Sequence, residues 1–227
     1  MKFGTIVAGV CGAVLLTGTL LMGSSYFVGR AFEAAQDESS TLMQSMRKQM
    51  FADMMHDAMR GVVYRSLYAA NIGDADIAEQ AQGEIVEYGD AFVDAIDSQK
   101  ALSLPTDIRT ALDDIAVPLT SYIESARSIV SQANSADTAT LAAALPAFET
   151  AFGALEDGME AVSDTIEAGN VRNTSASEAV ATLSNLVNAG GLAVILTLVG
   201  AMAPASAARL STAAASPGPS TPSASRA

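Results

Sequence analysis

The chain has 227 residues, of which 50% are hydrophobic and only 5% aromatic, and a formal net charge of −13. All 25 acidic residues lie between Glu33 and Glu178 and nine of the 12 basic residues lie between Arg30 and Arg172, so the middle of the chain carries −16. Such a surface repels nucleic acid, which is not an expected partner. The single cysteine, Cys11, excludes an intrachain disulfide and zinc sites of the Cys/His type.

Residues 1–29 predict a first transmembrane helix. Phe3–Gly29 carry no charge and are flanked by Lys2 and Arg30, and this length is enough to cross about 30 Å of hydrocarbon. A cleaved signal peptide is the alternative, but its apolar core would be unusually long and no A-x-A site follows. We therefore expect an uncleaved anchor with Lys2 on the cytoplasmic side.

Residues 30–185 predict an extracytoplasmic domain of amphipathic helices joined by short turns. The first helix covers Arg30–Asn71. Gly73 is suited to end that helix and Asp74 to cap the second one. Pro105 is suited to the start of the third helix.

The third and fourth helices carry narrow apolar stripes. The third stripe runs from Ile108 to Ala133, and Pro118 inside it should kink the helix or remove a backbone hydrogen bond. The fourth helix has apolar residues at alternating steps of four and three, which is typical of a helix packed lengthwise against others. These residues are Leu141, Leu145, Phe148, Phe152, Leu155, Met159, Val162 and Ile166. The expected fold is all-α, an antiparallel up-down four-helix bundle flanked by two transmembrane helices.

Residues 186–203 predict the second transmembrane helix, with no break between it and the fourth bundle helix. Two spans place the acidic bundle outside the cytoplasm and both termini inside it. Residues 204–227 contain 18 Ala, Ser or Pro residues and no acid, so this tail is expected to be disordered. A soluble helix that continues into a membrane span is typical of a transmembrane signal transducer.

A short motif in the first helix adds a resemblance to a known family. The segment Met54-Met-His-Asp-Ala-Met-Arg-Gly-Val-Val-Tyr64 resembles the pattern M-x-H-D-x-x-R-x-x-V of four-helix-bundle sensor domains in bacterial chemoreceptors, the methyl-accepting chemotaxis proteins. Together with the order span, bundle, span, the resemblance covers residues 1–203. It implies the input half of a chemotaxis receptor: a two-span protein of the cell inner membrane, with its bundle in the periplasm, dimerising through the first helix.

Such receptors continue into a HAMP linker and a long cytoplasmic coiled coil that contacts a kinase. This sequence has neither, and we expect a truncation or frameshift after the second span. The alternatives are a membrane-anchored structural bundle, which could form mixed dimers with full-length receptors, and the sensor half of another transducer such as a histidine kinase. No catalytic motif is visible, so neither an enzyme nor a cofactor is expected.

The resemblance places candidate ligand-binding residues on the first helix: Arg60, Arg65, Tyr64 and Tyr68. Arginine is suited to holding a carboxylate through two hydrogen bonds. A receptor for aspartate would be expected to have a further arginine at position 69, where this chain has Ala69, so amino-acid binding is not expected.

A structural interpretation of the same helix competes with ligand binding. His56, Asp57 and Arg60 stand at i,i+3 and i,i+4 spacing and could form a polar cluster that fixes the register of the helices. His56 is the only histidine and is expected on the helix surface; a pH-sensing role is the alternative.

Overall fold

The computed structural model is all-α in the part that it describes, namely the backbone of residues 3–133 and 137–214 and the side chains of residues 8–133 and 137–200. Its helices are α1 (Phe3–Ile72), α2 (Ala75–Lys100), α3 (Thr106–Asp114), α4 (Ala116–Gln132) and α5 (Thr138–Ala214). The chain divides into two compact units, one of residues Ala34–Ala176 and one of the segments before and after it.

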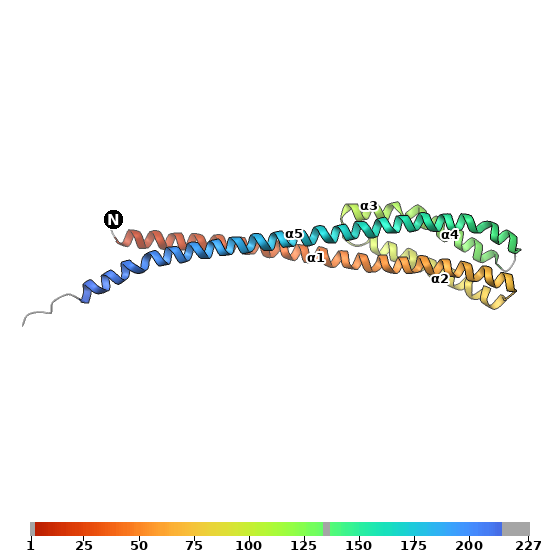
Figure 1. The fold of residues 1–227 in the computed structure, drawn as a ribbon, viewed down its shortest axis with the longest axis horizontal. Coiled ribbons are helices and arrows are strands. Elements are labelled where there is room, and N and C mark those ends of the chain that lie inside the picture. Colours follow the sequence, from red (N-terminus) through yellow and green to blue (C-terminus); the bar gives the residue numbers. More distant parts are fainter. Residues whose placement is uncertain (1–2, 134–136, 215–227) are drawn as a thin grey trace, which may run out of the picture. The chain divides into compact units, whose positions relative to one another are not determined.

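Within Ala34–Ala176 the helices form a four-helix bundle in which α3 and α4 together make the third helix (Figure 1). Neighbouring helices run antiparallel. Two contacts set the register of α1 against α2: Lys48 Nζ donates to Ser98 Oγ at 2.8 Å, and Arg65 pairs with Glu84. Gln49 sets the register of α1 against α5 by donating to the Met159 carbonyl at 3.1 Å. The predicted packing of four helices is confirmed.

The core consists of the predicted apolar stripes. The apolar residues predicted at alternating steps of four and three from Leu141 to Ile166 lie on α5 and are called the α5 seam below. All of them are buried except Leu145, which is partly buried against the same core. The largest buried side chains of the other helices include Met59 of α1, Phe92 of α2, Leu112 of α3 and Tyr122 of α4. Burial of apolar side chains is the main force that holds such a bundle together.

The turn between α1 and α2 is formed as predicted. Gly73 has a φ of 74°, a conformation that glycine adopts without strain. The Asp74 carboxylate then accepts hydrogen bonds from the backbone N–H groups of Asp76 and Ile77, both at 3.1 Å. This cap satisfies two donors at the start of α2 that have no partner within the helix.

The predicted disturbance at Pro118 is a break between α3 and α4. Proline has no backbone N–H and its ring clashes with the carbonyl four residues earlier, which here belongs to Asp114, the last residue of α3. Ile115 is a turn residue between the two helices and is buried, so the apolar stripe continues across the break.

The second unit contains two helical segments that are long and apolar enough to cross a membrane, by length and composition. None of either apolar window is buried in protein, and Leu20 and Leu196 are examples of its exposed side chains. Helix α5 continues to Ala214, beyond residue 204, where the disordered tail was predicted to begin. Residues 215–227 of that tail lie outside the described part of the chain.

Candidate functional site

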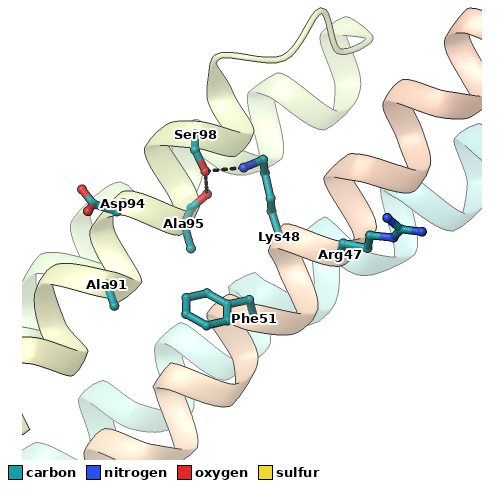
Figure 2. Close-up of a pocket in the computed structure, with 7 residues that line it drawn as sticks. All are labelled: Arg47, Lys48, Phe51, Ala91, Asp94, Ala95 and Ser98. Atoms are coloured by element: carbon teal, nitrogen blue, oxygen red, sulfur yellow. Dashed lines mark hydrogen bonds between the residues drawn. The ribbon is translucent and has the colours of Figure 1, made fainter.

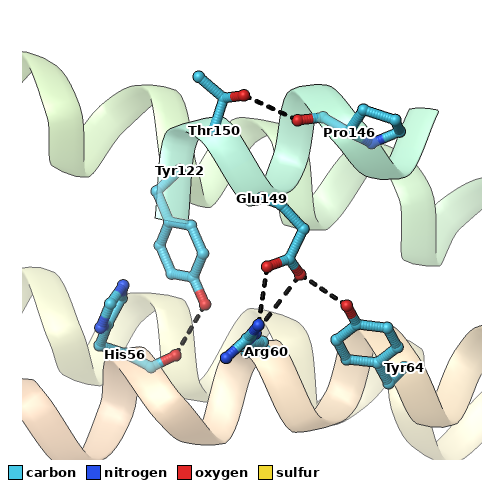
Figure 3. A network of polar contacts seen from close by, with 7 residues as sticks. All are labelled: His56, Arg60, Tyr64, Tyr122, Pro146, Glu149 and Thr150. Carbon is cyan, nitrogen blue, oxygen red and sulfur yellow. Dashed lines mark hydrogen bonds and ion pairs between the residues drawn. The ribbon is translucent and has the colours of Figure 1, made fainter. Parts of the chain in front are cut away.

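The interface between α1 and α5 brings two of the four candidate ligand-binding residues together. Arg60 Nη2 lies 2.7 Å from Glu149 Oε2, and Tyr64 donates its hydroxyl hydrogen to Glu149 Oε1, also at 2.7 Å (Figure 3). The Arg60 guanidinium also lies 4.3 Å from the centre of the Phe152 ring. Arg60 is thus held by a carboxylate from its own chain, and an incoming anion would have to compete with Glu149.

The pKa values at this cluster follow from those contacts. The hydrogen bond to Glu149 raises the pKa of Tyr64, and the same carboxylate raises the pKa of Arg60. Burial acts to raise the pKa of Glu149, but the hydrogen bonds from Tyr64 and Arg60 and the charge of Arg60 outweigh it, so this pKa lies below its ordinary value. Both side chains of the ion pair are partly exposed, at 40% for Arg60 and 31% for Glu149, so water weakens their attraction.

His56 is a core residue, and its predicted place on the surface is wrong. It is 2% exposed, and its ring stacks on Phe152 with the ring centres 4.0 Å apart. Its backbone carbonyl accepts a hydrogen bond from the Tyr122 hydroxyl at 2.7 Å (Figure 3). The prediction failed because the buried side of α1 faces α2, α4 and α5 together, and this wide arc includes polar positions such as Ser45 and Gln49.

The burial of His56 changes its chemistry. Desolvation by burial lowers the pKa of His56 below the ordinary 6.5, against the opposing effects of the Asp57 carboxylate, the Phe152 backbone, and the Glu156 and Asp53 carboxylates. Its Nε2 has no hydrogen-bond partner among the described residues. The imidazole is therefore held as the neutral form in the core, and Asp57 lies exposed on the outer side of the helix.

The other predicted residues lie apart from this cluster. Arg65 points towards α2 and pairs with Glu84, and Tyr68 is exposed. The expected cluster of His56, Asp57 and Arg60 does not take the predicted form, because Arg60 pairs with Glu149 across the interface. The sequence reasoning missed Glu149, whose position next to the buried Phe148 could have indicated that it borders the interface.

A groove of about 480 Å³ lies between α1 and α2 and is drawn in Figure 2. The Phe51 ring lies between the two helices, whereas the side chains of Arg47 and Asp94 point away from the groove. Lys48, the remaining charged residue of the lining, is hydrogen-bonded to Ser98. The groove thus offers mainly apolar surface.

The described residues contain no group of three His, Cys, Asp or Glu side chains placed to hold a metal ion. Comparison with protein-family models, with curated proteins and with solved structures found no match to this chain.

Proposed function

We propose that this chain is the ligand-sensing input module of a membrane receptor of the bacterial chemoreceptor type. The observation that carries the proposal is α5, a single helix from Thr138 to Ala214 that contains both the buried α5 seam and an exposed apolar stretch of membrane-spanning length. A small shift of a packed helix along or about its axis can be passed on by such a rod. The motif Met54–Tyr64 supports the same assignment.

The proposed location is the cell inner membrane, with the bundle in the periplasm and both termini in the cytoplasm. The uncharged stretch at the start of α1 and the one near the end of α5 would be the two spans. The acidic bundle carries nearly all of the charge of the chain, which suits a domain held clear of anionic headgroups.

The proposed receptor is a homodimer that pairs through the outer face of α1. This face carries exposed large side chains at steps of four, seven and ten residues along the helix, which keep them on one side of it. They are Met43, Met50, Met54, Tyr64, Tyr68 and Ile72. A row of this kind is unusual on the solvent face of a soluble helix and is typical of one that meets a partner helix. Arg60 and Tyr64 would lie at the edge of that interface, where a small molecule could reach them.

An experiment on the output tests the proposal. Residues 1–203 are joined to the cytoplasmic half of an established chemoreceptor, and kinase activity is measured in membranes. We expect activity, and we expect it to change when one alanine is inserted just before residue 186, because one residue rotates the following helix by about 100°. A membrane-anchored structural bundle predicts instead a chimera that stays inactive or an output indifferent to the insertion, and either result would refute the proposal.

A cysteine experiment tests the dimer. In a chain with Cys11→Ser, we expect Met54→Cys to form an intermolecular disulfide under mild oxidation, because its side chain lies on the proposed interface. Glu87→Cys, exposed on α2, is the matched control and should remain monomeric. Equal crosslinking at both positions would indicate random collision and would refute pairing through α1.

A further inference from the structure

His56 lies in the core at the contact between α1 and α5. Its ring is nearly parallel to the Phe152 ring of α5, with an interplanar angle of 10° and ring centres 4.0 Å apart. Arg60 stands one turn further along α1 (Figure 3), and its guanidinium lies 4.3 Å from the centre of the same Phe152 ring. Two side chains of α1 therefore hold Phe152, a member of the α5 seam.

The surroundings of His56 inside the core do not suit a positive charge. Among the described residues no Asp or Glu is buried. Helix α2 contributes the apolar ring of Phe92, and α4 contributes Tyr122, whose hydroxyl already donates to the His56 carbonyl. Glu149 of α5 is bonded to Arg60. A protonated ring in this place would be a buried cation without a partner and next to Arg60, which is strongly unfavourable.

The carboxylates that attract a protonated His56 lie outside the core. Asp53 and Asp57 of α1 and Glu156 of α5 are exposed, and each acts to raise the pKa of His56. Burial outweighs them as long as the ring stays inside. A ring that turned out of the core towards these carboxylates would escape the effect of burial and keep their attraction.

Burial therefore couples the proton to the position of the ring. Inside the core, Nε2 is shielded from solvent and has no hydrogen-bond partner among the described residues. The outward arrangement accepts a proton more readily, so its population rises as the pH falls. Below the ordinary pKa of 6.5, the ratio of outward to stacked rings increases by up to about tenfold for each pH unit. The increase ends at the pKa of the stacked ring.

We propose that His56 is a proton-operated switch between α1 and α5. At neutral pH the uncharged ring stays stacked on Phe152. At acidic pH the ring takes up one proton from water and turns outwards to Asp53 and Glu156. Phe152 then loses its partner, and the contact between α1 and α5 loosens. That this movement is passed on as a signal rests on the proposed function, whereas the movement of the ring does not.

NMR of the full chain in detergent tests the switch. His56 is the only histidine, so ¹³C-labelled histidine reports on this ring alone. A stacked ring shows a ring-current shift, and Phe152→Leu, which lacks the stacked partner, gives the reference signal. Between about pH 8 and pH 5, we expect protonation with a midpoint below 6.5 and loss of the ring-current shift in the same step. Protonation with the ring-current shift retained, or no protonation in this range, would overturn the proposal.

Charge variants test where the ring goes. Asp53→Asn with Glu156→Gln removes the carboxylates that receive the imidazolium, and the midpoint should fall by roughly half a pH unit or more. The matched control is Glu79→Gln with Glu87→Gln, which removes the same charge from an exposed part of α2 and should leave the midpoint nearly unchanged. Equal shifts in both variants would reflect only the overall charge of the bundle and would count against the switch.

The kinase chimera separates this proposal from that of the receptor. Its output should change between about pH 8 and pH 5, and His56→Gln, which is polar but does not titrate, should abolish the change. An inert chimera whose His56 ring still moves would refute the receptor and keep the switch. An active chimera whose ring stays stacked, or whose pH response survives His56→Gln, would refute the switch and keep the receptor.

Discussion

The buried His56 is best tested by removing its ring. In His56→Leu, the stack on Phe152 is lost, which costs about 0.5–1.5 kcal/mol. The substitution also removes Nε2, a buried nitrogen without a partner, whose presence costs about 1–3 kcal/mol. Since leucine has nearly the volume of histidine, little cavity is created. At about pH 8, where the histidine is neutral, we expect a change of roughly 1 kcal/mol in the free energy of unfolding, towards higher stability.

The dependence on pH is the sharper part of this prediction. The pKa of His56 in the folded chain lies below its ordinary 6.5, so the unfolded chain binds the proton first as the pH falls. The stability contributed by neutral His56 is present above about pH 6.5 and is lost as the pH falls through the folded-state pKa. The advantage of His56→Leu over the parent should therefore grow on acidification.

Thermal and urea unfolding of the full chain in detergent, followed by circular dichroism between about pH 8 and pH 5, gives the comparison. The difference between the free energies of unfolding of the two proteins at each pH removes the contribution of the surface carboxylates that both proteins share. Tyr122→Phe is the control: it removes the hydrogen bond to the His56 carbonyl, at a cost of about 1 kcal/mol, and leaves the titration in place. If the free energies of unfolding of the parent and of His56→Leu changed with pH in parallel, His56 would not be held neutral by burial, and the reasoning would be wrong.

Four further substitutions test other features of the bundle. Asp74→Ala removes the cap of α2 and should lower the free energy of unfolding by about 1 kcal/mol; an unchanged melting curve would contradict the cap. Gly158→Ala would place a methyl group 2.7 Å from the Ile115 side chain and should destabilise by about 1–3 kcal/mol, whereas Gly153→Ala meets no atom within 4 Å and should stabilise by up to about 1 kcal/mol through helix propensity. Glu149→Gln should cost at most about 1 kcal/mol, less at high salt, because the ion pair is partly exposed; a loss that does not respond to salt would count against this account.

The fold was predictable because its strongest signal is periodic. Steps of three and four residues fix which side of a helix is buried, and the α5 seam was found in this way. The start of α2 was predictable for a similar reason, because the turn at Gly73 and the cap at Asp74 involve only residues that are close in sequence. Such features depend on few residues that are close in sequence.

The polar contacts between helices were not predictable in the same way. Which carboxylate meets Arg60 depends on the register of α1 against α5, and a shift of one turn would have offered another residue. His56 was predicted on the surface because the hydrophobic pattern identifies only apolar residues as buried. A polar side chain can also lie on the buried side of a helix, as His56 does. Both errors arise where tertiary packing decides among locally equivalent positions.

The hydrogen bond from Gln49 on α1 to the Met159 carbonyl on α5 limits how far the two helices can slide along each other. It is 3.1 Å long and joins two neighbouring antiparallel helices inside the core. Hydrogen bonds of this type fade within a few tenths of an ångström beyond about 3.2 Å, so a slide of α5 by a whole turn, about 5.4 Å, would break the bond and leave two buried groups unpaired. Displacements of α5 along α1 that are well below one helical turn can keep this hydrogen bond, whereas a slide of a whole turn cannot. The buried amide of Gln49 therefore limits how far α5 can slide along α1.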